Sequence, residues 1–166
     1  MNEAQPQYQC AVLTISTGGA EGWREDTSGP AAQELLREAG FTIARAELVR
    51  DDVETIAAVL KRWADEDHIA LIVTSGGTGL SPFDFTPEAT RSVIQREVPG
   101  IAEAMRMRTL EKTPMAMISR GIAGSRGQSL IINLPGSPKG VRECLEVVMP
   151  VLKHAVALIR QDKTTH

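Results

Sequence analysis

The stretch that most constrains the fold is residues 69–90, IALIVTSGGTGLSPFDFTPEAT. It opens with an uncharged apolar run at residues 69–73, which is typical of a strand buried on both faces of a parallel sheet. Glycines flanked by hydroxyls follow at residues 74–79, where they let the backbone turn sharply and present bare N–H groups to an anion. Thr86 and Pro87 then fit the N-cap and the first residue of a helix. Together these features predict an anion site at the carboxyl edge of a sheet.

Asp84 is the unusual residue of this stretch, because Thr86 already supplies a cap. A carboxylate beside an anion-binding loop would repel a phosphate unless a cation lay between them. Mg²⁺ is commonly held by one or two carboxylates together with phosphate oxygens. Asp84 therefore indicates a divalent metal carried with a nucleotide. A solvated aspartate that forms an Asx-turn fits the local sequence equally well.

The size and charge of the chain exclude several classes of protein. Its 166 residues suit one domain with a sizeable core and polar tails at about 1–8 and 161–166. The formal net charge of −3 gives no sign of the basic stripe typical of nucleic-acid binding. No apolar run reaches the length of a membrane span, and the polar N-terminus lacks a signal-peptide core, so we expect a cytoplasmic protein without membrane contact. Cys10 and Cys144 are too few for a zinc site or a disulfide framework, and we expect both to be buried small hydrophobic residues.

Strands and helices are expected to alternate along the rest of the chain. The predicted strands are residues 9–16, 41–49, 69–73, 115–119 and 129–134, and the predicted helices are 31–39, from 53, 87–95, within 96–112, and 138–149, after which Pro150 kinks or restarts a last segment to 159. Residues 17–29 either cover a ligand or form a disordered surface loop, and the sequence slightly favours the disordered loop. For residues 120–127 we favour a flexible hairpin connection over a second phosphate loop. This alternation predicts a right-handed, doubly wound α/β sandwich.

Asp51 follows the second predicted strand and precedes a helix, so it has two compatible interpretations. With Glu54 it fits a capping box at the start of the helix, which is the interpretation that the local pattern favours. Asp51 also lies at the carboxyl end of a strand, on the same edge of the sheet as the glycine loop if the strands are parallel. Asp51 and Asp84 could then converge on one cation, with Asp52 as a weaker alternative to Asp51.

A second loop repeats the arrangement of strand, tight turn and capped helix. It consists of Pro135, Gly136, Ser137 and Pro138, in which Ser137 can cap and Pro138 can be the first helical residue. Arg106 is the first candidate for a contact to a ligand, because the arginine fork suits phosphate or carboxylate. A solvated helix face is the alternative for this residue.

Motifs that the chain lacks narrow the chemistry. The glycine loop has neither the GK[ST] of a P-loop nor the G-x-G-x-x-G of a dinucleotide fold. No G-x-S-x-G elbow is present, and the histidines do not suggest a hydrolytic triad.

Four motifs in order, TSGGTGLSPFDFTPEAT, EVPGIAEAMR, SRGIAGSRG and IINLPGSPKGVRECLE, closely resemble the molybdenum-cofactor biosynthesis family, which includes molybdopterin adenylyltransferases and gephyrin G domains. The resemblance covers about residues 10–159. It implies a three-layer α/β/α sandwich with a mostly parallel sheet and a homotrimer or hexamer. It also implies transfer of AMP from Mg-ATP to the terminal phosphate of molybdopterin, release of pyrophosphate, and hand-over of the product to the metal-insertion enzyme.

The resemblance also carries over to individual residues. The two essential acids of the family map onto Asp51 and Asp84, which would be catalytic and hold Mg²⁺. The candidates for substrate and nucleotide binding are Ser75, Gly76, Gly77, Thr78, Gly79, Ser81, Pro135, Gly136, Ser137, Pro138 and, from its own chemistry, Arg106.

Three positions depart from the family pattern. Thr17 stands where an aspartate is frequent, Phe83 where an arginine is frequent, and Arg50 where a proline is common. The changes at Thr17 and Phe83 motivate an alternative function, a carrier that binds molybdopterin without adenylylating it.

Overall fold

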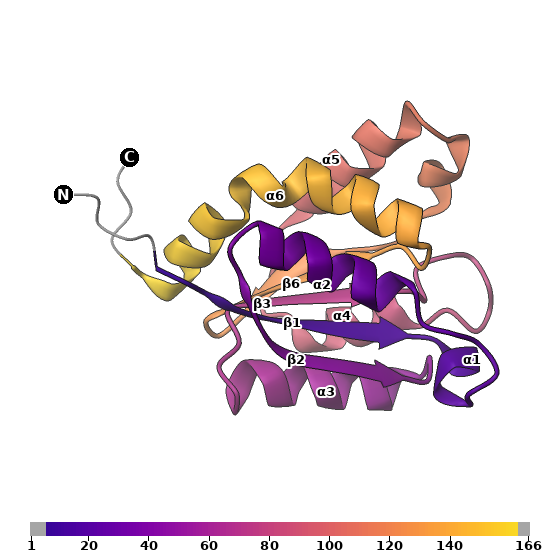
Figure 1. The fold of residues 1–166 in the computed structure, drawn as a ribbon, viewed down its shortest axis with the longest axis horizontal. Coiled ribbons are helices and arrows are strands. Elements are labelled where there is room, and N and C mark those ends of the chain that lie inside the picture. Colours follow the sequence, from indigo (N-terminus) through magenta and orange to yellow (C-terminus); the bar gives the residue numbers. More distant parts are fainter. Residues whose placement is uncertain (1–5, 163–166) are drawn as a thin grey trace.

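The computed structural model describes residues 6–162 and shows a six-stranded sheet between two layers of helices (Figure 1). The strands follow the spatial order β2-β1-β3-β6-β5-β4. The parallel strands are Gln9–Ile15 (β1), Thr42–Val49 (β2), Leu71–Ser75 (β3) and Ser129–Leu134 (β6). At one edge, Ala123–Arg126 (β5) pairs antiparallel with β6, and Arg96–Glu97 (β4) pairs antiparallel with β5. The predicted α/β/α sandwich with a mostly parallel sheet is confirmed.

Helices cover both faces of the sheet. The helices of one layer are Ser28–Glu38 (α2), Pro99–Leu110 (α5) and Pro138–Arg160 (α6), and those of the other are Val53–Asp65 (α3) and Thr86–Val93 (α4). Successive strand residues point to opposite faces, so Cys10 and Val12 pack in the core beneath α2 and α6, whereas Ala11 and Leu13 pack beneath α3. Strands with both faces buried therefore appear as continuous apolar runs. Both cysteines are buried as predicted, and burial raises the pKa of the Cys10 thiol to about 12.

The fourth predicted strand, residues 115–119, is wrong, because this segment forms a 3-10 helix, Pro114–Ile118 (η1). Thr113 caps it by accepting the N–H of Met115 at 3.3 Å. The place beside β6 is taken instead by β5, from the segment predicted as a hairpin connection. The hairpin itself is present, and Gly127 makes its turn at φ +53°. Apolar side chains in 115–119 thus reflected a surface helix rather than a buried strand.

Two other helical predictions also change at their ends. Residues Arg96 and Glu97 form β4, so the helix expected within 96–112 begins only at Pro99. The last helix, α6, runs without interruption through Pro150, so this proline does not restart it.

Residues 17–29 are ordered, so the favoured interpretation of a disordered surface loop is wrong. They contain a short helix, Thr17–Ala20 (α1), capped by Ser16, whose Oγ accepts the N–H of Gly19 at 3.0 Å. Asp26 then accepts the N–H of Gly29 at 2.9 Å and the Thr14 hydroxyl at 2.8 Å, which ties the segment to β1 and to the start of α2.

The two ends of the described chain lie together. Of the predicted polar tails, residues 1–5 and 163–166 lie outside the described part, whereas Tyr8 is buried and its hydroxyl donates to Asp162 at 2.9 Å. Within residues 6–162, no helix has the length and apolar character needed to cross a membrane.

Candidate functional site

The glycine loop lies at the carboxyl end of β3, in the middle of the sheet. Gly76 and Gly77 have φ values of +98° and +66°, a left-handed conformation that favours glycine. A Cβ on Gly76 would collide with the carbonyl oxygen of Ile15, and one on Gly77 would collide with the side chains of Thr86 and Asp51. The loop thus packs too closely against its neighbours to carry side chains at these two positions.

The backbone of this loop presents unused donors. The N–H of Gly76 donates to the carbonyl oxygen of Leu134 at 3.2 Å. None of the hydrogen bonds found among residues 6–162 uses the N–H groups of Gly77, Thr78 and Gly79. Successive unpaired N–H groups in a left-handed turn are suited to binding an anion.

Thr86 braces the loop instead of capping a helix. The predicted N-cap role is wrong, because α4 begins at Thr86 and its N-cap is Phe85, which makes no side-chain capping bond. The buried Thr86 hydroxyl donates to the carbonyl oxygen of Gly76 at 2.8 Å, and the Thr86 N–H donates to that of Gly77 at 3.1 Å. A helix start and a glycine loop are thereby held together at one point.

Asp51 points toward the same loop, and its predicted capping role is also wrong. The N-cap of α3 is Asp52, whose Oδ1 accepts the N–H of Thr55 at 2.9 Å. Hydrogen bonds from the side chain of Thr55 and from its N–H lower the pKa of Asp52. Because the helix starts one residue later than the capping-box pattern implied, the Asp51 carboxylate is not used as a cap. Its Oδ1 accepts the N–H of Phe85 at 2.9 Å, which places it beside Gly77.

Asp84 lies on the other flank of the loop. Its Oδ2 accepts the N–H of Ser81 at 3.2 Å and would be 2.8 Å from a Cβ on Gly79. The bond runs backwards along the chain, whereas an Asx-turn would run forwards. Burial raises the pKa of Asp51, although the bond from Phe85 lowers it, and the charge of Asp84 raises it further. The structure therefore brings the two predicted acids together around the glycine loop, close enough for one to affect the ionisation of the other.

Arg120 fixes this arrangement, although nothing in the local sequence indicated its role. Its Nε donates to the carbonyl oxygen of Gly79 at 2.7 Å and its Nη2 to that of Asp84 at 2.9 Å. Its guanidinium also pairs with Glu88, which lowers the pKa of that carboxyl. The backbone N–H of Arg120 donates to the carbonyl oxygen of Thr78 at 2.8 Å. These partners lie far away in the sequence and are mostly backbone carbonyls, so no local motif could have revealed them.

The second predicted loop touches the first. A Cβ on Gly136 would lie 3.3 Å from the Cα of Gly76. Ser137 caps α6 as predicted, accepting the N–H of Gly140 at 3.0 Å, and Pro138 is the first residue of that helix. The two loops and the two acids therefore share the carboxyl edge of the parallel strands.

A cavity of about 360 Å³ opens beside the second loop, between α5, η1 and the start of α6. Its lining is largely apolar, with Met105 and Cys144 among the contributors, and the cations Arg106, Lys112 and Lys139 also line it. Arg106, the predicted ligand contact, uses Nη1 to donate to the carbonyl oxygen of Gly121 at 2.8 Å.

Two other predicted residues have internal contacts. Ser75 is buried at the end of β3, where its hydroxyl lies 3.0 Å from that of Ser28. Ser81 is exposed, and its hydroxyl accepts the N–H of Phe83 at 3.2 Å. Within residues 6–162 no group of three or more histidine, cysteine, aspartate or glutamate side chains is arranged to hold a metal ion. The pair Asp51 and Asp84 fits a hard cation that brings its remaining oxygen ligands with a phosphate.

Comparison with known proteins gives consistent matches over most of the chain. A family model described as a probable molybdopterin binding domain matches residues 11–154. The molybdopterin adenylyltransferase of Helicobacter pylori J99 is 46% identical over 150 residues, which cover 89% of this chain and 85% of that protein. The crystal structure of the molybdopterin biosynthesis enzyme MoaB from Thermus thermophilus is 52% identical, has a TM-score of 0.90, and is matched over 96% of this chain and 100% of that one. The molybdopterin biosynthesis Mog protein from Mycobacterium ulcerans is 41% identical with a TM-score of 0.86, over 92% and 99% of the two chains.

Proposed function

The chain belongs to the molybdopterin-binding family of molybdenum-cofactor biosynthesis proteins, and from this premise we propose that it is a molybdopterin adenylyltransferase. It transfers AMP from Mg-ATP to the terminal phosphate of molybdopterin and releases pyrophosphate. The observation that carries the proposal is the placement of Asp51 and Asp84 on either side of a loop with unused backbone N–H groups. This placement suits a nucleotide that arrives with its own metal ion.

The reaction needs charge stabilisation and positioning more than proton transfer. An oxygen of the molybdopterin phosphate attacks the α-phosphorus of ATP, and the bond from that phosphorus to the oxygen bridging to the β-phosphate breaks. The attacking phosphate is already anionic at neutral pH, so no strong general base is required. Catalysis then rests on orientation and electrostatics, as in phosphoryl transfer generally.

Each part of the site has a distinct task in this scheme. Asp51 and Asp84 would hold Mg²⁺, which neutralises charge on the phosphates when bound. The N–H groups of residues 77–79 stabilise the negative charge on the phosphate groups. Arg120 keeps the loop in place through the carbonyl oxygens of Gly79 and Asp84, so the donors are already oriented before the substrate arrives.

The cavity beside the second loop is proposed to take the pterin. Its volume of about 360 Å³ lies within the usual range for small-molecule sites. Met105 and Cys144 can contact the flat ring, while Lys112 and Lys139 offer positive charge for the polar groups and the phosphate. Both lysines also pair with Glu143, which lines the same cavity, so a bound phosphate would share them with this acid. Because Gly136 lies against Gly76, the phosphate of a molybdopterin bound in this cavity would extend toward the glycine loop.

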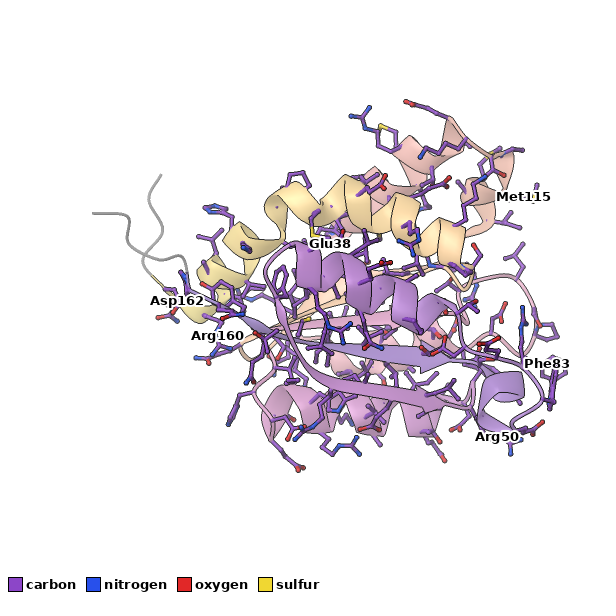
Figure 2. All side chains as sticks on the ribbon, in the orientation of Figure 1. Glu38, Arg50, Phe83, Met115, Arg160 and Asp162 are labelled. Carbon is purple, nitrogen blue, oxygen red and sulfur yellow. The ribbon has the colours of Figure 1, made fainter. Side chains whose placement is uncertain are left out.

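We also expect the chain to work as a homotrimer or hexamer in the cytoplasm and to pass its product to the metal-insertion enzyme. Helix α5 and η1 pack together and expose a set of large apolar side chains: Met107, Leu110, Met115, Met117 and Ile118. Figure 2 shows Met115 at the outer corner of the molecule, away from the sheet. Exposed apolar patches of this kind often mark interfaces. Sedimentation of the purified chain tests this expectation, and a monomer at micromolar concentration would contradict it.

The experiment that tests the function is incubation with molybdopterin, ATP and Mg²⁺, followed by mass spectrometry. We expect one adenylylated molybdopterin for each pyrophosphate released, and no product when EDTA removes the metal. The alternative, a carrier, would bind molybdopterin and leave ATP intact. The Thr17 hydroxyl accepts the N–H of Asp51 at 3.3 Å, so the residue that departs from the family pattern still contacts the segment that carries Asp51.

A further inference from the structure

Two large aromatic side chains stand in solvent at the rim of the proposed site. Trp23 is 71% exposed and Phe83 is 74% exposed, whereas the other tryptophan, Trp63, is completely buried. Aromatic side chains normally contribute large apolar area to a core, whereas these two rings remain accessible to a ligand. Figure 2 shows Phe83 at the same end of the molecule as Arg50, where the parallel strands end, and far from Arg160 and Asp162.

Trp23 is held in place at this rim. Its ring lies against Gly18 of α1, since a Cβ on Gly18 would be 2.8 Å from two ring carbons. Its indole Nε1 donates to Glu21 Oε2 at 3.0 Å, and Glu21 Oε1 pairs with Arg50 at 2.9 Å. Arg50 directly precedes Asp51 in the chain, so these contacts tie the indole to the segment that carries one of the two acids.

Phe83 occupies the corresponding position beside the other acid. It directly precedes Asp84, and its N–H donates to the Ser81 hydroxyl at 3.2 Å. The bond from Arg120 to the Asp84 carbonyl oxygen at 2.9 Å holds the next residue. The backbone that carries the phenyl ring is therefore fixed, while the ring itself faces water.

We propose that Trp23 and Phe83 bind the base of the nucleotide by stacking, an inference that rests on the proposed function. Phosphates bound at residues 77–79 leave the base within one ribose of the loop, and the cavity beside the second loop is assigned to the other substrate. Every base has a π-face on which an aromatic ring can stack, so we expect the site to discriminate weakly between nucleotide bases.

Loss of either ring should weaken the binding of ATP and leave its turnover nearly unchanged. Trp23→Ala and Phe83→Ala should each raise the KM for ATP about tenfold, within the range expected for loss of one base–aromatic stack, with kcat changed less than about twofold. Trp23→Phe and Phe83→Tyr keep a ring and should restore most of the affinity. Leu158→Ala, at an exposed apolar residue near the end of α6, is the matched control and should leave both constants unchanged.

A binding measurement without turnover separates this inference from the proposed function. Exposed Trp23 is open to acrylamide quenching and buried Trp63 is not, so protection of the fluorescence reports on the rim. The non-transferable analogue α,β-methylene-ATP with Mg²⁺ should protect it, and tripolyphosphate with Mg²⁺ should not. Product formation with unchanged KM in both alanine variants would overturn the base site alone. Protection by the analogue without any adenylylated product from wild-type protein would overturn the proposed function while supporting the base site.

Discussion

Replacement of Asp51 by asparagine separates the catalytic role of this residue from its structural one. The Asp51 carboxylate accepts one hydrogen bond, from the N–H of Phe85 at 2.9 Å, and its other oxygen lies beside Gly77. An asparagine side chain keeps an oxygen for Phe85 but loses the negative charge. We therefore expect Asp51→Asn to fold normally and to lose about 10²–10³ in kcat, the usual effect of removing one preorganised electrostatic contact.

Asp51→Ala removes the acceptor as well as the charge. The N–H of Phe85 is then left without a partner in a half-buried position, which costs on the order of 1 kcal/mol. In a domain of this size that corresponds to a drop of about 2–4 °C in Tm. Both variants should be equally inactive, and only the alanine variant should be less stable.

Asp52→Asn is the matched control for this pair. Asp52 is the adjacent acid, but it caps α3, and asparagine caps helices about as well as aspartate. Pyrophosphate release and urea unfolding of the variants test the prediction together. Turnover of Asp51→Asn within about threefold of wild type, or a loss in Asp52→Asn as large as in Asp51→Asn, would refute the reasoning.

Other contacts in the structure make four more outcomes testable. Arg120→Ala should raise the KM for ATP and lower the free energy of unfolding by about 1–2 kcal/mol, because it removes the donors to the carbonyl oxygens of Gly79 and Asp84. A loss of kcat alone, with unchanged urea unfolding, would argue against this role of Arg120. Trp63→Phe should destabilise the fold by clearly less than the roughly 3–5 kcal/mol of truncating a buried tryptophan to alanine, since the buried indole N–H has no hydrogen-bond partner and its removal offsets part of the lost packing. A cost equal to that of Trp63→Ala would contradict this reasoning. Pro150→Ala should raise the free energy of unfolding by about 1–3 kcal/mol in urea, because this exposed proline lies inside α6, where its missing N–H and its ring disfavour the helix. An unchanged free energy of unfolding would mean that the helix accommodates the proline without cost. Burial and Asp84 raise the pKa of Asp51, so the folded chain binds its proton more tightly than the unfolded chain, and this contribution to stability is present below pH 3.8 and lost as pH rises through the folded pKa. The kcat/KM for ATP, which depends on the ionised form in the free enzyme, should fall in acid at a pH above 3.8, and a fall only below that value would refute the assignment.

Much of the fold follows from patterns that are visible along the chain. The apolar runs at β1, β3 and β6 are buried on both faces, so each reads as an unbroken hydrophobic segment. The start of α6 at Ser137 and Pro138 was predicted because capping depends on local chemistry. The strand expected at residues 115–119 was wrong because an apolar segment need not be buried. Its apolar residues Met115 and Met117 are exposed, and periodicity cannot distinguish a surface patch from a core strand.

The site was harder to read because its important contacts are long-range. Asp51 matched a capping box one residue too early, and only the structure shows that Asp52 caps the helix and that Asp51 points to Phe85. Arg120 acts on carbonyl oxygens 41 and 36 positions away, which leaves no trace in the local sequence. Conversely, the cluster of glycines was visible in the sequence itself. The structure gives the reason for Gly76 and Gly77, whose positive φ angles and tight packing disfavour any other residue.

A crystal structure with α,β-methylene-ATP and Mn²⁺ tests the proposed metal and phosphate sites directly, because the blocked bond prevents transfer and the metal can be located by its anomalous signal. We expect one Mn²⁺ contacted by the carboxylates of Asp51 and Asp84, with phosphate oxygens on the N–H groups of residues 77–79. Phosphates bound elsewhere, or a metal ion that touches neither carboxylate, would contradict it.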